Sequence, residues 1–120
     1  MNTREKGKRG EEIAAEYVNS HGGRVIDSNF YFKGGEIDLV AKEKWLGEDY
    51  LCFVEVKMRD NTEAGYPEEA VTLAKQKKII KGALAYMNYR KIPADLTPIR
   101  FDVIAVLGDE VKWIKNAFTA

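Results

Sequence analysis

Three ionisable side chains on two consecutive predicted strands carry the chemistry that this sequence suggests. Asp38 lies in the segment GEIDLVA, and Glu55 and Lys57 lie in the segment LCFVEVKMR, which follows a short charged interruption. Both segments alternate as β-strands do, and acids among such apolar residues are costly to bury unless they are paired or bind a metal. If the two strands are adjacent and antiparallel, the two carboxylates can converge across the sheet.

Two converging carboxylates would supply the hard oxygen donors that suit Mg²⁺ or Mn²⁺. Such an ion lowers the pKa of a bound water and stabilises the charge that builds on a phosphate. Lys57 shares a strand face with Glu55, where it could orient or deprotonate that water or neutralise the phosphate. The structural alternative is that Asp38 caps a turn while Glu55 and Lys57 form a surface pair, and the residues alone leave both interpretations open.

Glu11 offers a third acid, from a helix predicted over residues 7–21. Ala14, Ala15 and Val18 lie three, four and seven positions after it, so Glu11 lies on or beside the apolar stripe of that helix. An acid on the core side of a helix can belong to a site, whereas an acid in a first turn can simply be a partner of the helix dipole.

The elements that would position these residues follow the order helix, three strands, helix, two strands. The helices are predicted over residues 7–21 and 67–89, and the strands over residues 24–32, 35–42, 50–58, 99–107 and 111–114, with a loop at 45–49 and a tail at 116–120. The third strand is apolar on most of both faces, so it should be central. This order predicts a three-layer α/β sandwich, one mixed sheet of about five strands flanked by helices, in one domain of residues 1–120.

Gln76 is the candidate site residue of the second predicted helix, and it falls on the apolar stripe. That stripe comprises Leu73, Ile79 or Ile80, Ala83, Leu84 and Met87. A glutamine there often lies only at the edge of the stripe. In the second predicted strand, alternation divides the residues between an apolar face of Ile37, Leu39 and Ala41 and a second face of Glu36, Asp38 and Val40.

Lysine plus arginine and aspartate plus glutamate each number 19, so the formal net charge is zero. Neutrality argues against a protein that coats nucleic acid through bulk charge. Cations nevertheless gather near the N-terminus, where Arg9 lies, and in the acid-free stretch 70–94, where Lys75 and Lys78 lie. Basic patches around an acidic centre fit a site that grips phosphates at its rim, and a solvated helix face is the alternative.

Compartment and redox chemistry follow from absences in the sequence. Cys52 is the single cysteine, so it cannot form an internal disulfide, and it reads as a small buried residue rather than a nucleophile. The sequence has no apolar run of about 20 residues and no apolar signal-peptide core near its start. We therefore expect a cytoplasmic protein.

Five short segments together resemble one known family. They read RGE at 9–11, GEIDL at 35–39, FVEVK at 53–57, RFDV at 100–103 and AF at 117–118. They resemble the YraN family of small bacterial proteins, which is similar to Holliday-junction resolvases of the PD-(D/E)-x-K nuclease superfamily. Ile37 stands where the superfamily name has a proline, and the resemblance covers essentially the whole chain.

The resemblance implies a restriction-endonuclease-like fold and a Mg²⁺- or Mn²⁺-dependent endonuclease that acts on DNA, with branched or junction DNA as a candidate in repair and recombination. It implies that Asp38 and Glu55 bind the metal, with the Val56 carbonyl as a further ligand. Glu11 would be the helical acid and Lys57 the catalytic lysine.

The resemblance implies lesser roles for other residues. Gln76 would point towards the site, Lys75 would contact a phosphate, and Glu36 would support Asp38, while Lys33 and Arg59 are candidate phosphate contacts. Junction resolution would require a two-fold symmetric homodimer that presents two sites to two strands. The alternative is a catalytically weak or inactive module that binds nucleic acid or a protein through the same fold.

Overall fold

The computed structural model describes residues 2–120 and contains two α-helices, a short 3-10 helix and five strands. In chain order these are α1 (Thr3–Ser20), β1 (Gly23–Phe32), β2 (Gly35–Trp45), β3 (Glu48–Arg59), η1 (Pro67–Ala70), α2 (Leu73–Tyr89), β4 (Ile99–Leu107) and β5 (Glu110–Phe118). Within these residues, neither α-helix has the length and apolar character needed to cross a membrane.

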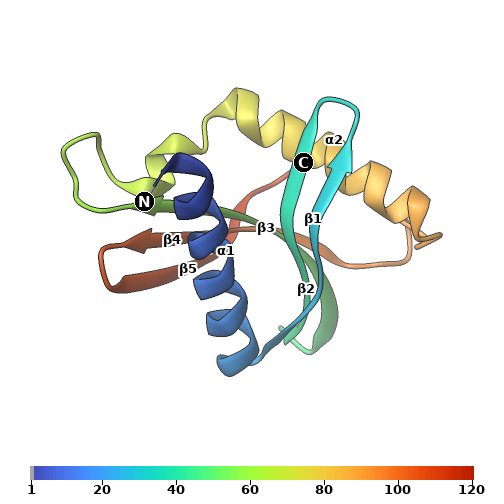
Figure 1. Cartoon of the computed structure of the whole chain (residues 1–120). Helices are drawn as coiled ribbons and strands as arrows, with labels where there is room; N and C mark the ends of the chain where they lie inside the picture. Colours follow the sequence, from blue (N-terminus) through green and yellow to red (C-terminus); the bar gives the residue numbers. More distant parts are fainter. Residues whose placement is uncertain (1) are drawn as a thin grey trace.

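The strands form one mixed sheet in the order β1-β2-β3-β4-β5. Strands β3 and β4 are parallel, and the other neighbouring pairs are antiparallel. Strand β3 is therefore central, as its apolar composition predicted. Helix α1 covers one face of the sheet and α2 crosses the other (Figure 1), so the predicted three-layer α/β sandwich is confirmed.

Two apolar clusters hold the layers together, one on each face of the sheet. Ala14 and Val18 of α1 pack against Leu39, Cys52 and Ile104. On the other face, α2 packs against the sheet through Ile79, Ala83, Tyr86 and Met87, which meet Phe53 and Phe101. The Cys52 side chain is fully buried, and burial raises the pKa of its thiol to about 12, so Cys52 is a core residue, as predicted.

The second predicted helix is broken, because η1 ends at Ala70 and α2 begins at Leu73. The Thr72 side chain accepts a hydrogen bond from the Lys75 N–H and thereby starts a new helix. The prediction that Leu73 and Leu84 face the core was wrong, since their exposed fractions are 67% and 54%. Both lie about a third of a turn around α2 from Ile79, outside the buried stripe.

Two connections also differ from the prediction. The expected loop at 45–49 is a two-residue hairpin turn, in which Leu46 and Gly47 both have positive φ angles. The expected tail at 116–120 is wrong for its first residues, because β5 continues to Phe118, whose ring stacks on that of Phe101. Asn116, with a φ of 54°, lies at the irregularity in β5 that interrupts the alternation.

Candidate metal centre

The acidic site forms where β2 and β3 stop pairing. Their ladder runs from the Leu39–Val54 pair to the Trp45–Glu48 pair and leaves Asp38 outside it. Asp38 Oδ2 instead accepts a hydrogen bond of 2.8 Å from the Val56 N–H. A carboxylate thus takes the place of the next backbone contact between the strands.

The side-chain alternation of β2 resets at the same point. Leu39 packs in the cluster under α1, whereas Ile37 packs in the cluster under α2 together with Val40. The prediction that Ile37 and Leu39 share one face was therefore wrong. On β1, Asn29 lies between the residues that pair with Ile37 and Leu39, and its φ of 51° shows that the backbone is irregular here.

Helix α1 brings Glu11 to this point because the preceding residue is a glycine. A Cβ atom on Gly10 would lie 3.2 Å from the Cβ atom of Met58 on β3, which is closer than such contacts normally allow. Gly10 is buried and Glu11 is half-buried. The close approach of α1 to the sheet places the Glu11 carboxylate over the end of the β2–β3 ladder.

Three carboxylates converge there. Glu11, Glu36 and Asp38 each provide one oxygen atom, and these atoms all lie within 4.8 Å of one another. The Asn29 Nδ2 atom donates to Glu11 Oε1 at 2.6 Å and to Glu36 Oε1 at 2.5 Å. Among residues 2–120, no lysine or arginine forms an ion pair with any of the three acids. We refer to Glu11, Glu36 and Asp38 as the acidic cluster.

The environment of the acidic cluster disfavours its negative charge. Burial and, after it, the negative charge of Glu55 raise the pKa of Asp38 to about 8, and the hydrogen bond from Val56 only partly opposes this rise. Burial also raises the pKa of Glu11, against a hydrogen bond from Asn29 that lowers it. A divalent cation would remove this electrostatic cost, and carboxylate oxygens are the donors that Mg²⁺ and Mn²⁺ prefer. The acidic cluster therefore fits such an ion.

Glu55 lies beside the acidic cluster but is paired with lysines. Its side chain is buried, and its Oε1 atom lies 3.2 Å from Lys75 Nζ and 3.8 Å from Lys57 Nζ. Lys75 comes from the first turn of α2, so the two helices approach the gap between β2 and β3 from opposite faces of the sheet. The acidic cluster, which pairs with no lysine or arginine among residues 2–120, therefore lies next to Glu55, whose charge is balanced by two lysines.

The structure brings together most, but not all, of the residues singled out in the sequence. Glu11, Asp38, Glu55 and Lys57 meet at the gap, where Val56 contributes its N–H to Asp38. A supporting role was expected for Glu36, but Glu36 provides one carboxylate oxygen to the acidic cluster, as Asp38 does.

Gln76 is directed elsewhere. Its Nε2 atom donates to the Val71 carbonyl at 3.2 Å, and its side chain lines a separate cavity together with Glu68 and Phe118. Of the expected phosphate contacts, Arg9, Lys33 and Lys78 are exposed. Arg59 and Lys75 are half-buried, with Arg59 Nη1 donating to the Met58 carbonyl at 3.3 Å.

Asn29 is the site residue that the sequence did not reveal. It lies in the polar interruption at 27–29, between the apolar stretches 25–26 and 30–32 of the first predicted strand, and that interruption was its only signal. Lys75 was expected to contact a phosphate, whereas the structure gives it Glu55 as a partner.

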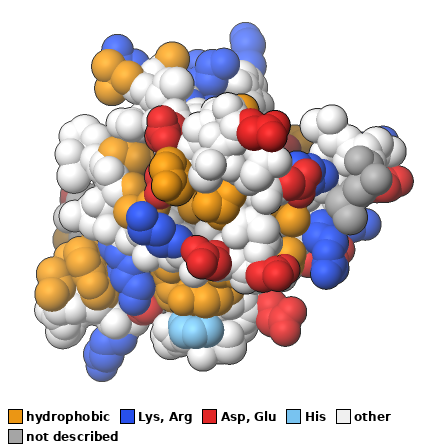
Figure 2. Space-filling model, turned by 90° about the vertical axis from the view of Figure 1, so that its left-hand side faces the viewer, with side chains coloured by type: hydrophobic (Ala, Val, Ile, Leu, Met, Phe, Trp, Pro, Cys, Tyr) orange, Lys and Arg blue, Asp and Glu red, His pale blue; other side chains and the backbone are white. Residues whose placement is uncertain are grey.

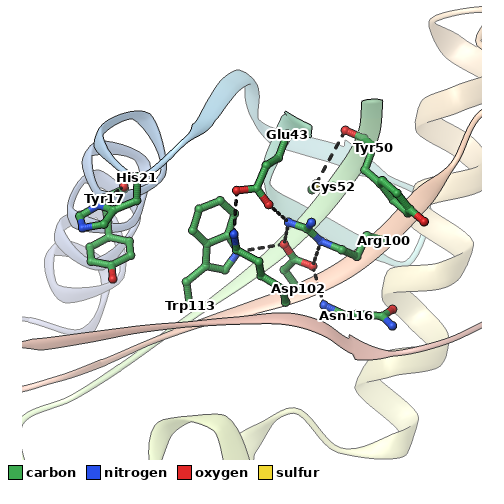
Figure 3. A network of polar contacts seen from close by, with 10 residues as sticks. Tyr17, His21, Glu43, Tyr50, Cys52, Arg100, Asp102, Trp113 and Asn116 are labelled. Carbon is green, nitrogen blue, oxygen red and sulfur yellow. Dashed lines mark hydrogen bonds and ion pairs between the residues drawn. The ribbon is translucent and has the colours of Figure 1, made fainter. Parts of the chain in front are cut away.

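A second group of buried charges lies away from the acidic cluster (Figure 3). Arg100 donates to both oxygens of Asp102, at 2.8 and 2.7 Å, and its Nη2 atom lies 2.8 Å from Glu43 Oε1. Lys115 and Trp113 complete the group through Glu43 and Asp102, respectively. Each buried carboxylate here has a cationic partner, so the group links β2, β4 and β5 structurally and contrasts with the acidic cluster.

The cavities of the molecule also separate these regions. A cavity of about 530 Å³ lies by the β2–β3 hairpin, and Arg24, Lys42 and Lys44 are among its lining residues. It shares no lining residue with the acidic cluster. A smaller cavity of about 160 Å³ adjoins the acidic cluster and is lined in part by Glu11 and Asn29.

Fold and site together define a class of protein. Proteins of this class are small α/β sandwiches. Half-buried carboxylates lie where two antiparallel strands stop pairing, next to a buried glutamate that is paired with two lysines.

The chain belongs to the YraN family, since residues 10–106 match the family described as "Uncharacterised protein family UPF0102". It is 43% identical over 120 residues to a UPF0102 protein of Lachnoclostridium phytofermentans, covering 100% of this chain and 98% of that one. A UPF0102 protein of Clostridioides difficile is 45% identical over 120 residues, covering 98% of this chain and 100% of that one. A UPF0102 protein of Legionella pneumophila is 41% identical over 120 residues, covering 98% of each chain. The resemblance drawn from the sequence is thus confirmed.

Proposed function

We propose that this protein is a metal-dependent endonuclease that hydrolyses phosphodiester bonds in DNA, with branched DNA as a candidate substrate. The observation that carries the proposal is the convergence of Glu11, Glu36 and Asp38 within 4.8 Å without a cationic side chain among them. Burying a charge without a partner of opposite charge costs free energy, and such unpaired charges are commonly found at functional sites.

The acidic cluster would hold one or two Mg²⁺ or Mn²⁺ ions, and Glu55, whose charge acts on Asp38, is the candidate for a further ligand. A bound ion supplies an acidified water and stabilises charge on the phosphate. Asn29 keeps the Glu11 and Glu36 carboxylates oriented through its amide. The hydrogen bond from Val56 fixes Asp38 in the same way.

The two lysines supply the positive charge for the phosphate. Lys57 Nζ lies 3.8 Å from Glu55, and its side chain is 26% exposed, so it remains within reach of a ligand. The Lys75 side chain is 38% exposed and comes from α2, which covers the face of the sheet opposite to α1. Either ammonium group can leave Glu55 for a phosphate oxygen or for the attacking water.

Cleavage assays test the proposal directly. The full chain is incubated with Mg²⁺ or Mn²⁺ and flap, four-way, single-stranded and duplex DNA. We expect cleavage that falls on the order of 100-fold or more in both Asp38→Asn and Lys57→Ala. Asp38→Asn weakens the proposed metal site, and Lys57→Ala removes the ammonium group proposed to act on the phosphate or on the attacking water. The matched control is Glu16→Gln, because Glu16 is an exposed acid of the same helix as Glu11. This variant should cleave as the wild type does.

A binding module without cleavage is the second candidate. The observation that favours it is the 3.2 Å ion pair between Lys75 and Glu55, which already compensates one of the acids that a metal would use. Binding of DNA without cleavage by the wild type, across all four substrates and both metals, would favour this candidate over the nuclease.

A further inference from the structure

Two tyrosines near the acidic cluster are mostly exposed, although the Tyr89 ring rests against that of Phe30, with the ring centroids 5.8 Å apart. Tyr31 of β1 is 72% exposed, and Tyr89, the last residue of α2, is 70% exposed. Single exposed apolar side chains are normal on a protein surface, so it is the hollow shared by these two tyrosines that singles them out.

The strand register places Tyr31 directly opposite Glu36 on the neighbouring strand. Directly opposed residues of an antiparallel pair project from the same sheet face, with Cβ atoms roughly 4.5–5.5 Å apart. Tyr31 is therefore the exposed cross-strand neighbour of one carboxylate of the acidic cluster.

A hollow joins the two tyrosines. A cavity of about 480 Å³ along the edge strand β1 is lined by both tyrosines, by Phe30 and by Arg90. Asn29 also lines it, and the same residue lines the 160 Å³ cavity that contains Glu11. The hollow thus meets the acidic cluster at the residue whose amide bridges Glu11 and Glu36.

Charge and polarity distinguish this hollow from a site for an apolar protein surface. Lys33 is exposed in the turn that follows Tyr31, and Arg90 follows Tyr89 on the surface. The strand side of the hollow is polar, with Ser28, Asn29 and the acid Asp27, whose Oδ2 atom lies 3.8 Å from Arg90 Nη1. Aromatic faces flanked by cations are how proteins bind single-stranded nucleic acids, because bases stack on the rings while cations follow the phosphates.

We infer that Tyr31 and Tyr89 form a stacking platform for unpaired nucleotides, and that the preferred substrate is DNA with a single-stranded segment at the site. A base within a continuous duplex is already stacked on its neighbours, so it cannot offer its face to Tyr31. The choice of nucleic acid as the ligand rests on the proposed function.

Binding measurements without a catalytic metal test the platform independently of cleavage. The probe is a single-stranded oligonucleotide containing 2-aminopurine, whose fluorescence is quenched on stacking, compared with the same strand in a duplex, with EDTA present. Tyr31→Ala and Tyr89→Ala remove the rings, whereas Tyr31→Phe retains one. Tyr66→Ala is the matched control, since Tyr66 is 54% exposed and lines neither hollow.

We expect the wild type to bind the single strand more tightly than the duplex. Tyr31→Ala or Tyr89→Ala should weaken single-strand binding by roughly 5- to 150-fold and reduce the quenching, while Tyr31→Phe and Tyr66→Ala should bind as the wild type does. Thermal unfolding checks that the variants are folded, as expected for changes to exposed side chains.

Equal affinity of the wild type for single strand and duplex, or unchanged binding by both alanine variants, would overturn the platform. Mg²⁺-dependent cleavage, measured in parallel, separates the two hypotheses: cleavage with unchanged binding removes the platform alone, and altered binding without cleavage removes the nuclease alone. If the wild type binds neither DNA, and Tyr31→Ala converts a dimer into a monomer, the surface belongs to a second copy of the chain and the platform is wrong.

Discussion

At the scale of single residues, two groups of buried acids differ in how their negative charge is balanced. Glu43 and Asp102 lie against Arg100, and their cost of burial is offset by hydrogen bonds and opposite charge. Asp38 has only a backbone N–H and acidic neighbours, so its charged form is disfavoured. Ionic pairing thus stabilises the structural group, while the acidic cluster keeps its capacity to bind a cation.

The pKa of Asp38 predicts how the metal-free protein responds to pH. The folded-state pKa of about 8 lies above the ordinary aspartate pKa of 3.8, so the folded protein binds the Asp38 proton more tightly than the unfolded chain does. Protonation of Asp38 therefore contributes stability at low pH, and this contribution is lost as the pH rises from about 4 through 8. The loss is at most about 1.4 kcal/mol for each pH unit crossed.

Urea denaturation of the full chain in EDTA at pH 5, 6.5 and 8 measures this dependence. We expect Asp38→Asn to remove most of the decline, because the amide does not titrate, and Mg²⁺ to restore stability to the wild type at pH 8. The same decline in wild type and Asp38→Asn would assign the effect to other groups.

Glu36 and Asn29 provide the second test at this scale. Because Glu36 lies in the acidic cluster, we expect Glu36→Gln to weaken Mn²⁺ binding as severely as Glu11→Gln does. Asn29→Ala should weaken it by about 10- to 100-fold, the usual effect of losing a group that orients metal ligands. Isothermal titration calorimetry with Mn²⁺ gives these affinities, and Glu16→Gln is the control. If the Glu36→Gln variant binds Mn²⁺ with wild-type affinity, Glu36 has only the supporting role that was first expected of it.

At the scale of helices and strands, close packing of α2 depends on one glycine. A Cβ atom on Gly82 would overlap the ring of Phe32 and lie 2.9 Å from Ile37 Cδ1. The apolar cluster under α2, to which Ile37 belongs, offers no free space for that atom. We expect Gly82→Ala to lower the free energy of unfolding by about 1–3 kcal/mol through overpacking.

Gly7 of α1 is the matched control for this change. A Cβ atom there would meet nothing within 4 Å, so Gly7→Ala should raise the free energy of unfolding by about 0.5–1 kcal/mol through helix propensity alone. Chemical denaturation of both variants gives the comparison. Equal stabilisation by the two substitutions would show that α2 can move away from β1 without cost.

The same scale shows what could be predicted from the sequence. Alternation and apolar content led to the order of elements and the central position of β3, because these patterns report which faces are buried. The antiparallel pairing of β2 and β3 was only assumed for the site, and the structure has it. The position of Asn29 could not be read in this way, since its role depends on an irregular backbone at the end of a ladder. The break before α2 was hidden because Thr72 caps a helix within a stretch that otherwise looks helical.

At the scale of the whole molecule, the formal net charge is zero. Figure 2 shows lysines and arginines interspersed with acids over the face that it displays, in keeping with the net charge of zero. Nucleic acid would therefore be held by a few local cations around the acidic cluster. The bulk field of the protein would contribute little.

This distribution predicts a weak salt dependence of DNA binding. If no more than the five cations expected at the rim, Arg9, Lys33, Arg59, Lys75 and Lys78, contact phosphates, the slope of log K against log salt for a single strand should be no steeper than about −3.5. Titrations between 50 and 300 mM salt in EDTA measure the slope. A much steeper value would require a larger basic surface than the rim provides.

Two lysine substitutions then decide where that surface lies. Lys33→Ala removes a cation beside Tyr31 and should make the slope shallower by about 0.7, the contribution of one phosphate contact. Lys44→Ala removes a cation from the 530 Å³ cavity at the other end of β2 and should leave the slope unchanged. The reverse result would place the nucleic acid along Arg24, Lys42 and Lys44. Because those residues share no cavity with Glu11, Glu36 or Asp38, DNA bound there would be separated from the acids that the proposed cleavage requires, and the binding module would then be the better description of this protein.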